Sequence, residues 1–341
     1  MTPRSKSILR TVLSVLLAAT FLAVAFRGIN LAELLGTLGN LRYGWIALII
    51  PSGLLSHYAR ALRWKYMLGH VKEGLSVRNL FAAVMIGYMV NNVLPRVGEL
   101  VRPYVAGRLE GISKSTALGS VVVERIIDFV AVAFLLSLIM FASPSTLGVF
   151  FDNADALRPW FLGGSVISLL LFIALFLKSE ALVRSVRLLL VFVPQRSRPR
   201  VEVFFDRFAS GFRIASEPRH LWIIVTLSLV IWGLYAAALY LPFYAYPDIA
   251  SADPGFGGAV VLLALSSVAF IIPVPGAFGT YHSFLRFALA RLYGIDDVVA
   301  LSFAIVTHEL NVILVSVTGA YFLVKDHLRI TDVSASAAEE A

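Results

Sequence analysis

The chain contains about eight apolar runs, each near the roughly 20 residues that a helix needs to cross a bilayer. Of its 341 residues, 59% are hydrophobic and 15% are charged, a balance that soluble domains do not have. We therefore predict an all-α polytopic membrane protein. The runs lie near residues 8–26, 43–62, 79–94, 115–142, 160–178, 221–244, 257–273 and 297–324.

Charged residues between the runs set the expected topology, because loops rich in lysine and arginine stay in the cytoplasm. Residues 60–78 and 184–219 are strongly basic, whereas the charged residues within 143–159 and 247–257 are mainly aspartates. We expect the first two segments inside and the other two outside. Basic residues also flank the first and last runs, so both termini are expected on the cytoplasmic side of the cytoplasmic (inner) membrane.

Two of the runs lead into proline and glycine breaks. Residues 79–94 are followed by Pro95 and Gly98, and residues 257–273 lead into residues 273–280, which repeat the pattern. Eight full crossings would contradict the loop charges, so each break is predicted to form a re-entrant helical hairpin. Each half then holds three transmembrane helices and one hairpin, which makes the halves inverted repeats. Eight simple transmembrane helices are the alternative.

A faint internal repeat supports two halves. Residues 1–330 are expected to form a single membrane domain, with disordered residues 331–341 after it. Repeat 1 covers about 8–142, repeat 2 about 160–326, and a basic cytosolic linker about 179–220. Matching residues of the halves are 180 to 183 positions apart: Pro95 and Pro275, Gly98 and Gly279, Gly111 and Gly294.

The run 115–142 contains Glu124, Arg125 and Asp128. Glu124 follows about nine residues of helix, or roughly 14 Å of rise, which places it near mid-bilayer. An uncompensated charge there costs several kcal/mol, so these residues are functional candidates. Arg125 and Asp128 can pair at i,i+3, and Arg96 or Arg102 can supply a cation for Glu124. Alternatively, the network only holds the hairpin to the helix.

The second half places His308 and Glu309 about eleven residues after Asp297, roughly 16 Å along a helix. His282 follows the second break and can relay protons, meet a phosphate, or simply be satisfied by a neighbouring helix. No metal or cofactor is expected, because the histidines lack close ligand spacing and the chain has no cysteine.

Other features have simpler interpretations. The net charge of +8 fits contact with anionic inner-leaflet lipids better than with nucleic acid. The basic segment 184–219 is expected to be a topological anchor, or an amphipathic helix on the inner leaflet. Several aromatic residues are expected to be interfacial anchors: Trp45, Trp64, Trp160, Trp222, Tyr240, Tyr244 and Tyr246.

Three stretches, NNVLPRVGELVRPYV, VVERIIDFV and PVPGAFGTYHSF, resemble the blocks of the lysylphosphatidylglycerol synthase transmembrane-region family, also called flippase-like domain proteins. The resemblance covers about residues 8–326. It implies translocation of a lipid, such as an aminoacylated phospholipid, a polyprenyl-linked sugar or a hopanoid-type lipid. The matching positions are Asn92, Pro95, Arg96, Gly98, Glu99, Arg102, Glu124, Arg125, Asp128, Pro275, Gly276 and Gly279.

The chain departs from the family pattern at two positions: Ala277 stands where the family often has glycine, and His282 where glutamate is expected. The sequence also ends soon after its last apolar run, without the aminoacyltransferase domain of the full synthases. We therefore do not expect it to make lysylphosphatidylglycerol.

The leading hypothesis is a lipid flippase, not an enzyme, which binds an anionic headgroup between the hairpin tips. The alternatives are an accessory subunit that presents lipid to a partner transferase, an intramembrane enzyme, and an ion or small-solute transporter. The candidate substrate-binding residues are Asn92, Arg96, Glu99, Arg102, Glu124, Arg125, Asp128, Gly276, Gly279, His282, His308 and Glu309.

Overall fold

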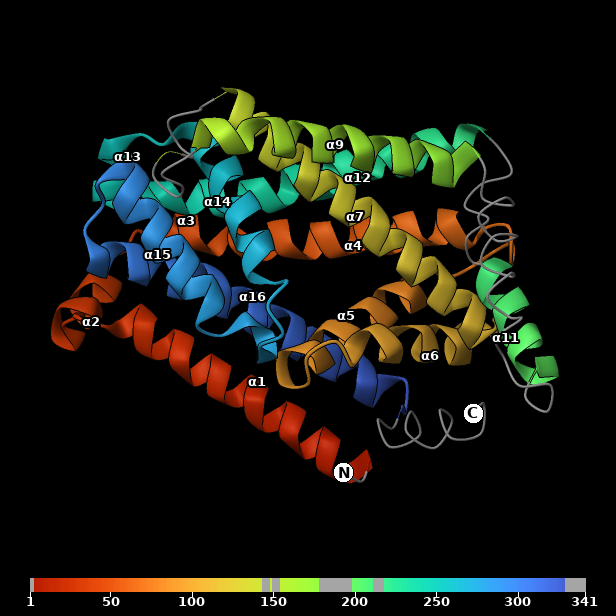
Figure 1. The fold of residues 1–341 in the computed structure, drawn as a ribbon. Coiled ribbons are helices and arrows are strands. Elements are labelled where there is room, and N and C mark those ends of the chain that lie inside the picture. The colour runs from red at the N-terminus through yellow and green to blue at the C-terminus, as the bar shows by residue number, and fades with distance from the viewer. Residues whose placement is uncertain (1–2, 143–147, 149–153, 178–197, 211–217, 329–341) are drawn as a thin grey trace.

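The computed structural model describes residues 3–142, 148, 154–177, 198–210 and 218–328, and these contain helices and no strand (Figure 1). The predicted all-α class is confirmed. The helices are α1 Pro3–Phe26, α2 Leu31–Gly39, α3 Tyr43–Ala47, α4 Ile49–Leu68, α5 Val77–Val93, α6 Gly98–Glu110, α7 Lys114–Ala142, α9 Ala154–Leu177, α11 Arg198–Ser210, α12 Pro218–Tyr240, α13 Pro247–Ala252, α14 Gly255–Ala269, α15 Thr280–Tyr293 and α16 Asp297–Lys325, with 3₁₀ turns η2 Leu241–Ala245 and η3 Pro275–Ala277.

Some predicted features lie outside the described residues. These are the tail 331–341 and most of the loop 143–159. Of the basic linker 179–220, the structure describes only α11 and the start of α12.

Within the described residues, two helical segments are long and apolar enough to cross a membrane, Arg219–Ala245 and Asp297–Lys325. A third candidate is the pair Val12–Phe26 and Leu31–Gly39, which is bent by 80°. Of the other expected runs, the one in α7 includes charged residues and the one in α5 forms a helix of only 17 residues.

The first break forms a tight helical hairpin of α5 and α6. The chain turns between Leu94 and Val97, where Arg96 adopts the left-handed φ of 66°. α6 begins at Gly98 and continues through Pro103, which lies inside the helix. Asn79, near the start of α5, donates to Glu110 at the end of α6 at 2.7 Å, so the two helices run antiparallel.

The two arms of this hairpin touch through glycines. A Cβ on Gly98 would lie 1.9 Å from the carbonyl oxygen of Gly87 and 2.7 Å from Oδ1 of Asn91. The amide of Gly98 also donates to that Oδ1 at 2.7 Å. No larger residue fits this contact without separating α5 from α6.

The second break forms a corresponding hairpin of α14, η3 and α15. Gly276 and Ala277 have positive φ values of 52° and 56°, so the non-glycine Ala277 takes a conformation that glycine adopts more easily. Gly258 on α14 approaches the Tyr293 hydroxyl at the end of α15, which makes this hairpin antiparallel as well.

The same order of elements follows each hairpin. Gly111 caps the C-terminus of α6 and Gly294 that of α15, and both are left-handed, with φ of 67° and 64°. A long helix begins three residues later in each case, α7 after the first hairpin and α16 after the second, and both have 29 residues.

α16 packs against both hairpins, through α5 on one side and α15 on the other, while α4 lies along α12 (Figure 1). One buried apolar cluster surrounds the first hairpin and includes Trp64, and a second surrounds Phe303 of α16 and the second hairpin. The expectation that Trp64 and Tyr246 anchor the interface is wrong, because they are 0% and 1% exposed. Both belong to the core.

Replacing Gly98 with alanine should destabilise the fold, because the new methyl group overlaps the Gly87 carbonyl. Such overpacking costs about 1–3 kcal/mol. The matched control is Gly233→Ala on α12, where a Cβ meets nothing within 4 Å. The control should leave the unfolding temperature unchanged or raise it slightly. Thermal unfolding of the purified variants in mild detergent tests this, and an equal unfolding temperature for Gly98→Ala would contradict the contact.

Candidate functional site

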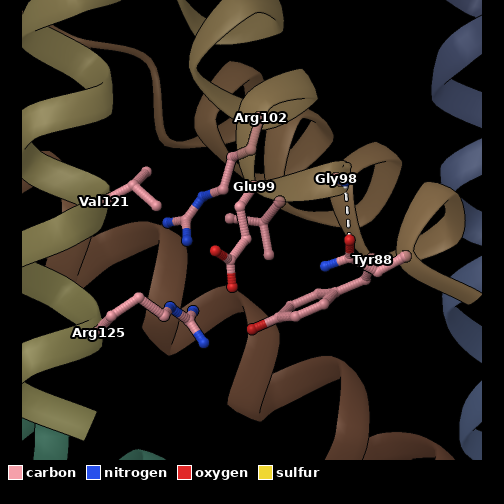
Figure 2. Close-up of a pocket in the computed structure, with 9 residues that line it drawn as sticks. Tyr88, Gly98, Glu99, Arg102, Val121 and Arg125 are labelled. Carbon is pink, nitrogen blue, oxygen red and sulfur yellow. Dashed lines mark hydrogen bonds between the residues drawn. The ribbon is translucent and has the colours of Figure 1, made fainter. Parts of the chain in front are cut away.

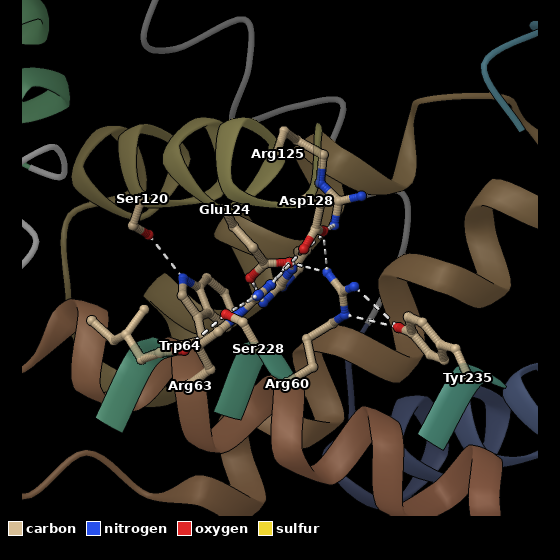
Figure 3. A network of polar contacts seen from close by, with 11 residues as sticks. Arg60, Arg63, Trp64, Ser120, Glu124, Arg125, Asp128, Ser228 and Tyr235 are labelled. Atoms are coloured by element: carbon tan, nitrogen blue, oxygen red, sulfur yellow. Dashed lines mark hydrogen bonds and ion pairs between the residues drawn. The ribbon is translucent and has the colours of Figure 1, made fainter. Parts of the chain in front are cut away.

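A buried network of charged side chains joins the four helices α4, α6, α7 and α12 (Figure 3). Its carboxylates are on α7, and its arginines come from α4, α6 and α7. α12 adds two hydroxyl groups. The members are Arg60, Arg63, Arg102, Glu124, Arg125, Asp128, Ser228 and Tyr235.

Glu124 is the centre of the network and has no solvent exposure. Arg102 binds it in a bidentate pair, with Nη1 2.7 Å from Oε1 and Nη2 2.8 Å from Oε2. Arg125 donates to Oε1 at 2.9 Å, and Arg60 contacts the same oxygen. Charge-assisted bonds of this kind are among the strongest in proteins.

Asp128, one turn further along α7, binds the same group of arginines. Arg60 and Arg63 donate to its two oxygens at 2.9 Å each, and Arg125 lies 3.6 Å away. The predicted i,i+3 pair of Arg125 and Asp128 is thus present. Arg60 also donates to the Tyr235 hydroxyl at 3.0 Å.

Aromatic and hydroxyl groups hold two of the arginines in place. The guanidinium of Arg102 lies 3.9 Å from the ring centroid of Trp64, a cation–π contact. Trp64 in turn donates its Nε1 hydrogen to Ser120 at 2.8 Å, and Arg63 donates to Ser228 at 2.9 Å.

The network has more positive than negative charge, since four guanidinium groups face two carboxylates. Three of these arginines are nearly fully buried, and the side chain of Arg125 is 38% exposed. A surplus of positive charge in a region of low dielectric attracts an anion more strongly than it would in water.

A small cavity adjoins the exposed side of the network, between α5, α6 and α7 (Figure 2). The half-buried Glu99 points into it beside Arg102, Arg125 and Tyr88. Within the described part of the chain, Glu99 forms no ion pair. The cavity volume of about 20 Å³ holds about one water molecule, which is too little for a phosphate group.

Sequence reasoning missed Arg60 and Arg63, which it assigned to a cytoplasmic loop. They lie inside α4 and are 3% and 0% exposed, so that part of the interpretation of residues 60–78 is wrong. The available signal was their i,i+3 spacing at the end of an apolar run, which puts both guanidinium groups on one helix face. Arg102, in contrast, is the partner of Glu124 that the sequence suggested.

Two candidates of the first hairpin lie away from the network, at its tip. Arg96 donates to the carbonyl oxygen of Ile271 in the second break at 3.2 Å. Asn92 donates to Ser316 of α16 at 3.1 Å, and its own carbonyl oxygen lies 3.2 Å from where a Cβ on Gly276 would stand. The tips of the two hairpins therefore meet, which brings distant parts of the chain together.

The remaining candidates form a second cluster where the second hairpin meets α16. His308 Nδ1 lies 3.2 Å from Glu309 Oε1, and His282 Nε2 lies 3.5 Å from the same oxygen. His308 Nε2 is 2.8 Å from the carbonyl oxygen of Gly276, and the amide of Gly279 donates to His282 Nδ1 at 3.2 Å.

The ligand atoms of His282, His308 and Glu309 lie within 4.8 Å of one another, a spacing that suits a metal ion. The hydrogen bonds argue against one. Because His282 Nδ1 accepts a backbone hydrogen bond, the neutral ring carries its proton on Nε2, the atom that faces Glu309. That nitrogen has no lone pair for a metal, so we do not assign these residues as ligands.

Long helices, antiparallel helical hairpins and a deeply buried ion network define a multi-pass helical membrane protein. The chain belongs to the family described as the lysylphosphatidylglycerol synthase TM region, whose model matches residues 11–319. The resemblance drawn from the sequence is confirmed.

Two relatives have general names. A UPF0104 membrane protein of Methanocaldococcus jannaschii is 23% identical over 300 residues, which are 78% of this chain and 87% of the relative. Another, from Methanothermobacter thermautotrophicus, is 25% identical over 233 residues, 63% of this chain and 64% of the relative. No solved structure matches the chain.

Replacing Glu124 with glutamine should destabilise the protein strongly, because it leaves four arginines, three of them nearly fully buried, with one carboxylate. Breaking a buried pair typically costs about 3–5 kcal/mol. The control is Asp297→Asn, which removes an exposed carboxylate that binds Arg286 through one contact of 3.0 Å and should cost below about 1 kcal/mol. Thermal unfolding measures both, and similar small losses would show that the network contributes little to stability.

Proposed function

We propose that this protein is a lipid flippase that binds an anionic headgroup at Arg102 and Arg125 and moves it across the cytoplasmic membrane. The observation that carries the proposal is the surplus of buried positive charge beside the cavity lined by Glu99. Arginine binds phosphate through paired hydrogen bonds, so a phosphate is the anion that fits best. Family membership supports a lipid as the molecule to which this phosphate belongs.

We infer that the hairpins re-enter the membrane and that the two halves have inverted orientations, with both termini in the cytoplasm. Three observations support this arrangement: the chain turns back at both breaks, the tips meet, and a glycine followed by a 29-residue helix closes each hairpin. Transporters built from inverted repeats bind substrate where such broken helices meet.

Binding requires a change of shape, because the cavity has room for about one water. Its walls belong to α5, α6 and α7, so it widens when the first hairpin moves away from α7. In the closed state Glu99 faces the arginines, as Figure 2 shows. In the proposed cycle the lipid phosphate takes the place of the Glu99 carboxylate, and the acyl chains stay in the bilayer.

The substrate we propose is a phospholipid or a modified one, such as an aminoacylated or polyprenyl-linked lipid. For an aminoacylated headgroup, Glu99 is well placed to bind the ammonium group beside a phosphate held by Arg102 and Arg125. A transferase that makes the lipid on the cytoplasmic side would then supply this protein.

The substitution Arg125→Gln should slow transport of an anionic lipid by about ten- to a hundredfold, the value of one charge-assisted hydrogen bond. The variant should still fold, because three arginines continue to face the two carboxylates. The matched control is Arg78→Gln, which removes a partly exposed arginine bound to Asp326 far from the cavity.

The measurement is the loss of a headgroup-labelled anionic phospholipid from the inner leaflet of proteoliposomes, with zwitterionic phosphatidylcholine as the comparison lipid. Equal rates for wild type and Arg125→Gln would contradict the assigned site. A wild-type protein that moves neither lipid faster than empty vesicles would contradict the function itself.

A further inference from the structure

The cluster of His282, His308 and Glu309 has a hydrogen-bonding arrangement that the lipid site does not explain. It lies on the second hairpin and α16, apart from the arginine network, and two of its three side chains are about 2% exposed. Both histidines are tied to the backbone of the second break, one through Gly276 and the other through Gly279.

The protons of this cluster can be counted from its contacts. A carbonyl oxygen only accepts, so the 2.8 Å contact to Gly276 requires a hydrogen on His308 Nε2. A neutral imidazole has one N–H, which leaves a lone pair on Nδ1. That lone pair lies 3.2 Å from Oε1 of Glu309, itself an acceptor when ionised. Two acceptors at this distance need a proton between them.

His282 does not provide that proton. Its Nδ1 accepts from Gly279, so its own hydrogen is on Nε2, which faces Glu309 Oε1 at 3.5 Å. This hydrogen points to Oε1 of Glu309, so it does not form a hydrogen bond with His308 Nδ1. One further proton, held on His308 or on Glu309, completes the cluster.

We propose that His308 and Glu309 form a proton-binding site whose occupancy holds the tip of the second hairpin against α16. With the proton bound, His308 bridges Glu309 and the Gly276 carbonyl. Without it, the lone pair and the carboxylate repel each other, and a rotation of the ring that relieves this repulsion breaks its bond to Gly276. Loss of the proton therefore loosens the tip.

The other groups around His308 and Glu309 do not place a further charge against the pair. On α15, Tyr281 lies with its ring 4.8 Å from that of His308 and its hydroxyl bonded to Thr307. From the first hairpin, Arg96 binds the Ile271 carbonyl and α5 presents the neutral Asn92.

Two further helices pack on α16. α4 brings His57 toward Asn311, the residue two positions after Glu309. α2 packs near Val298 and Leu301, more than one turn before His308. The titratable groups that contact the pair are thus His282 and Tyr281.

The chain has no cysteine, so spin labels can be placed at chosen sites without removing native ones. Exposed Ile271 in the second break and exposed Val317 on α16 are suitable positions, as Ile271→Cys and Val317→Cys. Pulsed electron–electron double resonance in nanodiscs between about pH 5 and 8 then measures the distance between the two labels, which reports the position of the hairpin tip relative to α16. For one proton, the ratio of loosened to docked tip should rise tenfold per pH unit above the midpoint.

The test variant is Glu309→Met, which keeps similar length but removes the opposing acceptor. His308 then keeps its bond to Gly276 at every pH, so the tip should stay docked. Glu33→Met is the matched control, because Glu33 is exposed on α2, and it should respond to pH like wild type. Thermal unfolding confirms that each variant is folded.

Three results would overturn the proposal: a tip that does not respond to pH in wild type, an unchanged response in Glu309→Met, or Zn²⁺ retained by the purified protein and lost in Glu309→Met. A ¹⁵N-histidine spectrum of wild type gives a second readout, in which one Nδ1 signal absent from His308→Gln changes from protonated to unprotonated over the same pH range. No lipid substrate is needed, so the outcome is independent of the flippase proposal.

Discussion

The buried carboxylate of Glu124 constrains the packing of the helices around it. It is fully buried, and a charge in that position must be compensated locally. Its partners come from α4, α6 and α7, while the same arginines reach α12 through Tyr235 and Ser228. The network thereby fixes the positions of the first hairpin and of α4, α7 and α12 relative to one another.

The helix that follows the second hairpin has the same length as the helix that follows the first, but it carries different polar groups. α7 carries a network of permanent charges, since arginine stays protonated throughout the physiological range. α16 carries a histidine and a glutamate in contact, groups that can gain or lose a proton. The two hairpins meet at Arg96 and Ile271, so a fixed electrostatic site and a titratable one lie on opposite sides of one contact.

The sequence predicted the helical class, both breaks, and the network residues Glu124, Arg125 and Asp128, because a charge or a proline inside an apolar run is visible without tertiary structure. It did not predict Arg60 and Arg63 as partners. An arginine at the end of an apolar run looks the same whether it faces a headgroup or a carboxylate on α7. The contact of His282 with Glu309 was also hidden, since only the packing of α15 on α16 closes their separation in sequence.

The position of Arg102 has a consequence for release of cargo. Of the four arginines it alone belongs to the hairpin, whereas the others are on α4 and α7. In the proposed cycle, a hairpin that moves away from α7 separates Arg102 from Glu124 and carries Glu99 along with it. An anion bound between Arg102 and Arg125 therefore competes with Glu124 for Arg102, and re-formation of that ion pair favours release of the anion.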